Sequence, residues 1–164
     1  MEIREVLPEE YEDAGRIVTL AYSEFGDRED EGWEEHLALV RDVAGRIDRT
    51  VVLVAVEDGR ILGSATIELD GVIGDDDHEI PPGGAVLRML GVDPELRRGG
   101  VGRALVQAVA GRARAAGRHT LVLRTTPPMT AAHSLYESMG FVRDESLDMP
   151  VYEAFDLLGY RLDL

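Results

Sequence analysis

The stretch Leu90-Gly-Val-Asp-Pro-Glu-Leu-Arg-Arg-Gly-Gly-Val-Gly-Arg103 is the most informative part of this chain. Its pattern is that of a buried strand, a proline turn and a glycine-rich loop that leads directly into a helix. Glycines in such a loop let backbone N–H groups approach a bound anion, and the helix N-terminus adds unpaired N–H groups and the positive end of its dipole. Arg97, Arg98 and Arg103 add positive charge. The sequence therefore predicts a phosphate-binding loop.

Two common phosphate-binding motifs do not fit this loop. A P-loop requires Gly-x-x-x-x-Gly-Lys-Ser/Thr, and the chain contains no lysine. A dinucleotide-binding fingerprint requires Gly-x-Gly-x-x-Gly near the start of a βαβ unit, whereas Gly99–Gly102 lies past the middle of the chain and no third glycine follows at the required step. An ordinary glycine-rich turn that begins a helix remains as the alternative.

A second motif, Leu135-Tyr-Glu-Ser-Met-Gly-Phe141, ends a predicted short helix and begins a predicted strand. With it, the Arg-x-x-Gly-x-Gly spacing of Arg97–Gly102 resembles the GCN5-related N-acetyltransferase family. That family has an Arg/Gln-x-x-Gly-x-Gly/Ala cofactor loop and, downstream of it, a Leu-Tyr-Glu-x-x-Gly-Phe signature. The resemblance covers most of the chain, and the motifs themselves occupy residues 85–141.

The resemblance implies that acetyl-coenzyme A is the cosubstrate. In the family fold, the strand before the cofactor loop separates from the strand after the long helix, and the pantetheine arm lies between the two. Backbone groups of Leu90 and Val92 are expected to face the pantetheine, and the amides of residues 98–103 are expected to bind the pyrophosphate. The cofactor-binding residues expected on this basis are Leu90, Gly91, Val92, Arg97, Arg98, Gly99, Gly100, Val101, Gly102 and Arg103.

The resemblance also assigns catalytic roles. Tyr136 is expected to protonate the departing thiolate after direct attack of the amine on the thioester; the alternative is a packed aromatic residue. Many relatives carry a glutamate near the start of the central strand, where this chain has Val86, and an asparagine seven residues before the tyrosine, where it has Met129. Glu68 is the candidate for the general base, directly or through water. His78 and Glu79 are weaker candidates, and solvated charge is the alternative for all three.

Length and composition are those of a single globular domain spanning residues 1–164, with 45% hydrophobic and 30% charged residues. The absence of cysteine excludes disulfides and thiolate metal ligands. His36, His119 and His133 fit no metal-binding pattern, so no metal site is expected. The charged N-terminus leads into no long apolar run, which predicts a cytoplasmic protein without a signal peptide or membrane span.

Charge is unevenly distributed along the chain. The net charge is −15, yet the segment Leu96–Tyr136 contains seven arginines and no acidic residue. Nucleic-acid binding is disfavoured, because the overall acidity repels a polyanion and the segment lacks aromatic residues for stacking. A single small polyanion such as coenzyme A fits this pattern better. The acidic remainder indicates either a cationic acceptor or a role in solubility alone.

The predicted fold is α/β, with a mixed sheet and helices on both faces, in the order β-α-α-β-β-β-α-β-α-β-β. Strands are expected at Glu2–Leu7, Thr50–Val56, Ile61–Leu69, Ala85–Val92, Thr120–Thr125, Phe141–Glu145 and Phe155–Asp163. Helices are expected at Pro8–Phe25, Trp33–Ile47, Gly100–Ala116 and from about Pro128 to Met139, with exposed loops at Gly26–Gly32 and Gly71–Gly84. The order matches the acetyltransferase fold.

The leading functional hypothesis is an N-acetyltransferase that acts on the primary amine of a small molecule or of a peptide or protein N-terminus. The alternative from another class is a coenzyme A-binding module without catalysis, which acts as a sensor or structural partner. Trp33, Tyr22 and Phe25 surround the first helix–helix connection, which lines the acceptor side in this family. Three interpretations of these aromatic residues are open: they line an acceptor pocket, pack in the core or form a homodimer contact.

Overall fold

The computed structural model describes residues 1–26, 31–73, 79–150 and 156–164. Its strands are β1 (Glu2–Glu5), β2 (Val51–Glu57), β3 (Arg60–Glu68), β4 (Gly84–Val92), β5 (Thr120–Thr125), β6 (Val142–Arg143), β7 (Met149–Pro150) and β8 (Asp156–Asp163). The α-helices are α1 (Tyr11–Tyr22), α2 (Glu31–Arg41), α3 (Val101–Ala115) and α4 (Thr130–Ser138). Short 3-10 helices are η1 (Pro8–Glu10), η2 (Pro94–Leu96) and η3 (Glu145–Leu147).

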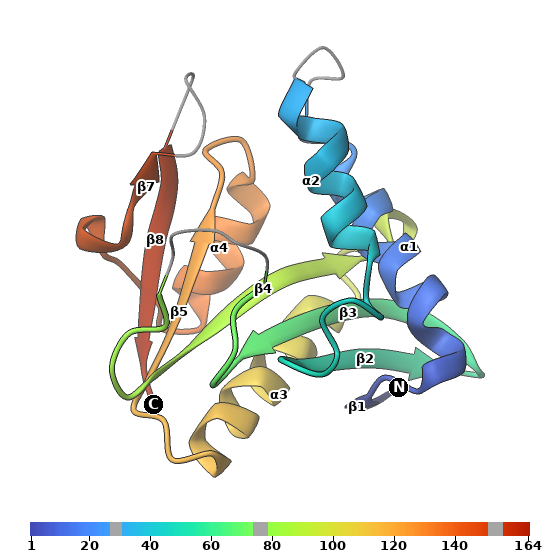
Figure 1. Cartoon of the computed structure of the whole chain (residues 1–164), viewed down its shortest axis with the longest axis horizontal. Helices are drawn as coiled ribbons and strands as arrows, with labels where there is room; N and C mark the ends of the chain where they lie inside the picture. Colours follow the sequence, from blue (N-terminus) through green and yellow to red (C-terminus); the bar gives the residue numbers. More distant parts are fainter. Residues whose placement is uncertain (27–30, 74–78, 151–155) are drawn as a thin grey trace.

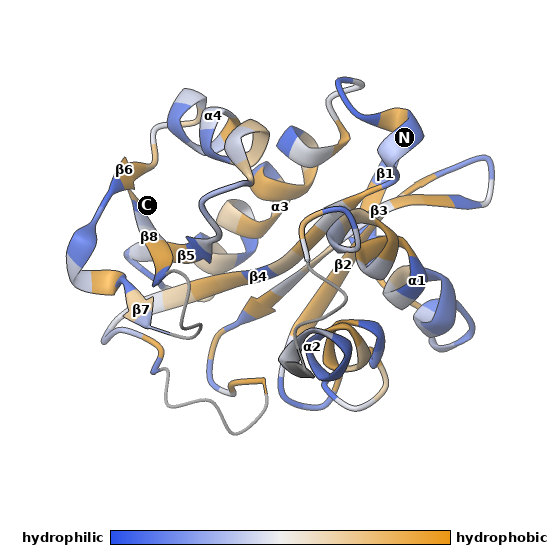
Figure 2. Ribbon diagram, turned by 90° about the horizontal axis from the view of Figure 1, so that it is seen from above, coloured by the Kyte–Doolittle hydropathy of each residue, from blue (hydrophilic) through white to orange (hydrophobic). Residues whose placement is uncertain are grey.

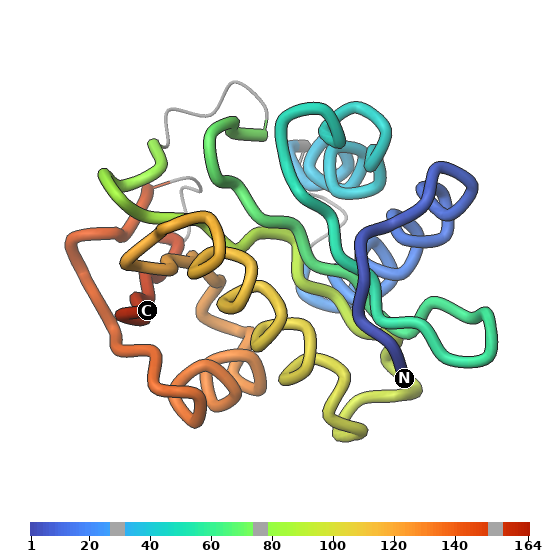
Figure 3. Tube along the Cα trace, turned by 90° about the horizontal axis from the view of Figure 1, so that it is seen from below, coloured from blue at the N-terminus to red at the C-terminus, as the bar shows by residue number. Residues whose placement is uncertain are grey.

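The strands form one mixed sheet in the order β1-β2-β3-β4-β5-β8-β6, with β7 also paired to β8. The β4–β5 pair is parallel, because α3 carries the chain back between them, and the other described pairs are antiparallel. Figure 3 shows the N-terminal strand at one side of the molecule and the C-terminus at the other. The predicted α/β class and mixed sheet are therefore confirmed.

Helices cover both faces of the sheet, as Figure 2 shows: α3 and α4 lie on one face, and α1 and α2 on the other. Successive residues of a strand point to opposite faces of the sheet, so each face has its own apolar core. Leu53 and Ala55 of β2 belong to the core that includes α3 and Tyr136 of α4, whereas Val52 and Val54 pack with α1 residues. A further apolar cluster joins Val18, Val40, Ile73 and Met89 beneath α1 and α2. The face covered by α1 and α2 is called the α1/α2 face below.

A bulge in β4 separates two parts of the sheet. Ser64 pairs with Gly91 and Thr66 pairs with Arg88, so two residues of β4, Met89 and Leu90, lie opposite one residue of β3. Met89 has a φ of 52°, a left-handed conformation that is uncommon for a residue with a side chain. Pairing of β4 with β5 runs from Gly84 to Leu87 and stops there, although both strands continue. The two strands diverge beyond this point (Figure 1).

Several element boundaries differ from the sequence prediction. The second helix ends at Arg41 rather than Ile47, because Arg46 turns back and donates to the carbonyl oxygens of Leu39, Val40 and Asp42. Ala44, beyond this helix end, is exposed. The strand expected at Phe141–Glu145 is reduced to β6, since the chain then enters η3. The short β7 adds a strand to the predicted order.

A tight turn joins β2 to β3. Asp58 and Gly59 both have positive φ, at 50° and 75°, which is the geometry of a two-residue turn between antiparallel strands. Gly117, which follows the end of α3, also has a positive φ of 74°. None of the described helices is long and apolar enough to cross a membrane.

Candidate active site

The N-terminus of α3 has the features of an anion site. Gly100 is its N-cap and adopts φ 81°, which favours glycine, and no side chain caps the helix. The first turn contains no acidic residue. The N–H groups of Val101, Gly102 and Arg103 therefore have no partner within the helix, and the positive end of the helix dipole lies beside them. Helix N-termini of this kind bind anions in many proteins.

Arginines surround this helix end. Arg97, Arg98 and Arg103 are all exposed. Arg97 Nη1 donates to Glu24 Oε2 at 2.6 Å, and Arg103 Nη2 donates to Ser138 Oγ at 2.7 Å. These two hydrogen bonds connect the loop to the segment after α1 on one side and to α4 on the other. Elsewhere on α3, Arg112 pairs with Glu5 of β1, so part of the basic segment is neutralised within the protein.

The segment Leu90–Val92 connects the β4 bulge to this loop. Leu90 and Val92 are half-buried. Gly91 is buried against α1, and a Cβ at this position would lie 2.7 Å from the Cα of Val18. Because real Cβ atoms do not approach a backbone atom so closely, only glycine allows α1 and β4 to pack in this way. This packing role accounts for Gly91 independently of any cofactor.

Tyr136 lies in α4, and its ring is buried against Phe141 and Tyr160, with ring centroids 5.6 and 6.3 Å away. Burial raises the pKa of its phenol above the ordinary value, and the nearby Tyr22 adds to this rise. The Tyr136 hydroxyl makes no hydrogen bond with any residue in the described part of the chain. The ring therefore has a packing role, and the hydroxyl donates to none of the described residues.

Glu68, at the end of β3, is fully buried and lies on the α1/α2 face. Its Oε1 accepts a hydrogen bond from the Ile73 backbone N–H at 2.7 Å and lies 3.3 Å from Nη1 of Arg88. Glu68 pairs with Val86 across the β3–β4 ladder. This carboxylate is therefore directly beside the strand position where many relatives carry a glutamate.

The other expected base candidates differ in position. Glu79 is exposed, and His78 lies outside the described residues. Met129, which replaces the expected asparagine, is the N-cap residue of α4, and its sulfur lies 3.7 Å from Thr125 Oγ1. No group of three or more His, Cys, Asp or Glu side chains that could hold a metal ion occurs in residues 1–26, 31–73, 79–150 and 156–164.

The aromatic residues near the first helix–helix connection pack together. The His36 ring stacks between Tyr22 and Trp33, at centroid distances of 6.2 and 5.6 Å. Trp33 is buried and covers Gly26, which favours a packing role for this residue. Burial raises the pKa of the half-buried Tyr22 to about 12, while the charges of Arg88 and Arg46 oppose this rise.

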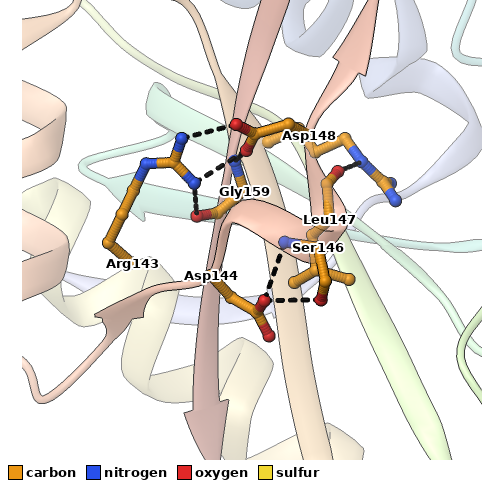
Figure 4. Close-up of polar contacts among 7 residues, drawn as sticks. Arg143, Asp144, Ser146, Leu147, Asp148 and Gly159 are labelled. Carbon is orange, nitrogen blue, oxygen red and sulfur yellow. Dashed lines mark hydrogen bonds and ion pairs between the residues drawn. The ribbon is translucent and has the colours of Figure 1, made fainter.

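Arg124 in β5 was not among the expected site residues. Its Nε donates to the Leu147 carbonyl oxygen at 2.6 Å. Figure 4 shows the network that positions η3: Arg143 binds both carboxylate oxygens of Asp148, and the Gly159 N–H donates to the same carboxylate. In the sequence, Arg124 stands out as a charged residue that follows the apolar run Leu121–Leu123 within a predicted strand. This was the signal that could have marked it as a candidate site residue.

Comparison with known proteins decides the family. The model of the Acetyltransferase (GNAT) family matches residues 7–141, which is most of the chain. The chain belongs to the GNAT acetyltransferase family. The match includes both the cofactor-loop motif and the Leu-Tyr-Glu-x-x-Gly-Phe motif. The resemblance deduced from these motifs is therefore confirmed.

Solved structures share the GNAT fold. A ribosomal-protein-alanine N-acetyltransferase from Brucella melitensis matches with a TM-score of 0.71 and 22% identity, covering 100% of both chains. A putative acetyltransferase from Salmonella typhimurium, solved with its cofactor acetyl-CoA, matches with a TM-score of 0.70 and 24% identity, covering 100% of this chain and 94% of that chain. The PaiA N-acetyltransferase from Thermoplasma acidophilum, in complex with coenzyme A, has a TM-score of 0.71 and 17% identity over 99% of this chain and 98% of that chain. A search of curated proteins found no match.

Proposed function

We propose that residues 1–164 form one acetyl-coenzyme A-dependent N-acetyltransferase domain that acts on a primary amine. The observation that carries this proposal is the uncapped N-terminus of α3, which has no acid in its first turn and has three exposed arginines around it. This site matches the diphosphate of coenzyme A in charge and in hydrogen-bonding capacity. GNAT structures that contain acetyl-CoA or coenzyme A support the choice of ligand.

The cofactor is held by two adjoining segments in this proposal. The amides of residues 98–103, with Arg97, bind the pyrophosphate, and backbone groups of Leu90 and Val92 face the pantetheine arm. The end of β4–β5 pairing at Leu87 and Leu123 supports this placement, because the β4 backbone beyond Leu87 is released from β5. Backbone groups released in this way need other partners.

The thioester supplies the acetyl group, which passes to the amine by direct attack. Tyr136 protonates the departing sulfur. Its hydroxyl has no hydrogen-bond partner in the described residues, and burial raises the pKa of the phenol, so it holds its proton to a higher pH than an ordinary tyrosine. Both features suit a general acid that must keep its proton until the carbon–sulfur bond breaks.

Glu68 is the proposed general base, directly or through water. Support comes from its position opposite Val86 on the same face of the sheet. The Oε1 of Glu68 accepts from the Ile73 N–H and lies beside Arg88, and the ionised form of a carboxylate is the one that accepts a proton from the amine. An amine with a low intrinsic pKa would depend less on this base.

The alternative proposal is a coenzyme A-binding module without catalysis. The observation that favours it is the engagement of Glu68 by the Ile73 N–H and by Arg88, together with Val86 at the position of the usual glutamate. The acceptor in the leading proposal is a small amine or a peptide or protein N-terminus. One structural neighbour, from Brucella melitensis, is named as a ribosomal-protein-alanine N-acetyltransferase, and this supports a protein N-terminus as a candidate acceptor.

A thioester assay separates the two proposals. The purified protein is incubated with acetyl-coenzyme A and a panel of small amines and peptides, and free thiol release is measured against a sample without amine. We expect amine-dependent release with at least one acceptor, and mass spectrometry should show the acetylated amine. Binding of acetyl-coenzyme A in calorimetry without turnover of any amine would favour the non-catalytic module.

A further inference from the structure

Three polar side chains form a row across the sheet on the α1/α2 face. Thr66 of β3 pairs with Arg88 of β4. Leu87 pairs with Leu123, and Arg88 and Arg124 are the next residues on their strands. Leu87 and Leu123 point into the core beside α3, so the residues that follow them face the other way. The two arginines therefore lie on neighbouring strands, at the point where β4 and β5 separate.

Among the described residues, positive charge exceeds negative charge around this row. Arg88 lies beside the buried Glu68, and its Nη1 also donates to the Ile73 carbonyl oxygen. Arg46, almost fully buried, lies on the same face, where it binds the carbonyls of Leu39 and Val40 that border the same apolar cluster as Ile73. Burial and the charge of Arg88 lower the pKa of Arg124. The nearby Asp148 already binds Arg143 with both oxygens.

Several donors in this region lack partners. Arg124 uses Nε for the Leu147 carbonyl, and its two terminal nitrogens make no hydrogen bond with a residue of the described chain. The buried Thr66 Oγ1 has no partner there, and neither have Nε and Nη2 of Arg46. A buried polar group without a partner destabilises the fold, and such groups usually mark a water, ion or ligand site.

We propose that the acceptor is an amine that also carries a carboxylate, and that Arg124, Arg88 and Thr66 form the carboxylate subsite. The inference rests on the proposed function, since it concerns the acceptor of that reaction. The terminal nitrogens of Arg124 present a planar pair of donors that matches the two oxygens of a carboxylate. Glu68, on the same face, can then attract the ammonium end. An amino acid has both groups, so this subsite replaces the simple cationic acceptor that the acidic composition indicated.

Binding of amino acids and their amides tests the subsite directly. A set of L-amino acids and the corresponding L-amino acid amides is titrated calorimetrically into the protein saturated with coenzyme A. We expect at least one amino acid to bind about tenfold or more tightly than its amide. Arg124→Gln should remove this preference, whereas Arg112→Gln, which removes an arginine from α3 on the other face, should keep it. Absence of any preference in the wild type, or its persistence in Arg124→Gln, would overturn the proposal.

Thr66→Val is a second test that separates ligand binding from folding. It removes a buried hydroxyl without a partner and preserves the side-chain shape, so the melting temperature should stay unchanged or rise. Affinity for the amino acid should nevertheless fall severalfold, and unchanged affinity would remove Thr66 from the subsite.

Acetyl transfer to the same compounds distinguishes the two proposals. Preferential binding of the amino acid without acetylation of any amine would retain the carboxylate subsite and reject the transferase. Acetylation of amides as efficiently as of the amino acids would retain the transferase and reject the carboxylate subsite.

Discussion

Arg97 Nη1 lies 2.6 Å from Glu24 Oε2, so the arginine of the cofactor-loop motif is paired with an acid just beyond α1. In the proposed complex, the pyrophosphate competes with this carboxylate for the same guanidinium. The two side chains are 40% and 44% exposed, which limits the strength of the pair. Exposed pairs typically contribute about 0.2–1 kcal/mol.

Removal of Glu24 should therefore strengthen cofactor binding. We expect Glu24→Gln to bind acetyl-coenzyme A about two- to fivefold more tightly, because Arg97 is released and a negative charge near the site is lost. Calorimetry at low salt measures the effect, and it should diminish as salt is added. Asp13→Asn, on the exposed surface of α1, is the control. Weaker binding in Glu24→Gln would show that the pair positions Arg97 rather than competing for it.

A negative charge at the start of α3 should prevent cofactor binding. A Cβ at Gly102 would make only ordinary contact with Leu135, so Gly102→Glu is compatible with the fold. It places like charge beside the pyrophosphate, and we expect a loss of affinity of at least about tenfold. Gly111→Glu makes the same change in the same helix, where nothing lies within 4 Å of an added Cβ. Equal affinity in the two folded variants would refute the assignment of the loop.

Tyr136→Phe tests the general acid. The ring and its packing on Phe141 are retained and only the hydroxyl is lost. Loss of general-acid assistance typically costs about 10²–10⁴ in rate, so kcat should fall in this range while affinity for acetyl-coenzyme A stays nearly constant. Steady-state kinetics and calorimetry measure the two quantities. Full turnover in Tyr136→Phe would leave the tyrosine with its packing role alone.

The pH profile of the wild type provides a separate check on Tyr136. Burial raises the pKa of this phenol, so the acid form persists above the pH at which an ordinary tyrosine ionises, near 10. Activity should therefore decline on the alkaline side only above about pH 10 if Tyr136 ionisation causes the decline. A decline that is identical in Tyr136→Phe would point to another group.

Gly91→Ala should destabilise the protein through packing. The added Cβ would lie 2.7 Å from the Val18 Cα, and the α1 backbone must move to accommodate it. Overpacking of this kind costs about 1–3 kcal/mol in the free energy of unfolding. Gly111→Ala, on the exposed side of α3, should instead increase stability by up to about 1 kcal/mol, because alanine favours the helix. Denaturant unfolding of both variants measures the contrast, and equal effects would contradict the close approach of α1 to β4.

Asp148→Asn should weaken the network around η3. Arg143 lowers the pKa of this carboxyl through its hydrogen bonds, with a further contribution from the Gly159 N–H. The pair therefore stabilises the fold above the ordinary aspartate pKa, and this contribution is lost as pH falls through the lowered value. We expect Asp148→Asn to cost about 1–2 kcal/mol at neutral pH and less below about pH 4. Asp163→Asn, at an exposed pair, is the control for unfolding measurements.

Local patterns in the sequence were sufficient for the glycine-rich helix start and for most of the elements. The Arg97–Gly102 spacing predicted an anion site at a helix start, and the structure has an uncapped helix beginning there. The β5 prediction at Thr120–Thr125 is confirmed residue for residue. These features depend on backbone preferences and on apolar periodicity over a few residues, which neighbouring residues determine. The roles of Tyr136 and Glu68 stay predictions, because they concern chemistry with a bound ligand.

Tertiary structure alone decided which distant residues meet. The end of α2 depends on Arg46, whose hydrogen bonds back to the helix carbonyls could not be read from the helical pattern. The β3–β4 register places Glu68 opposite Val86, and the β4–β5 register places Arg88 beside Arg124. A shift of one residue in either register would send these side chains to the opposite face, since successive strand residues alternate. Register follows from long-range pairing and the Met89 bulge, so the charges around the proposed acceptor subsite were determined by the folded sheet rather than by any local motif.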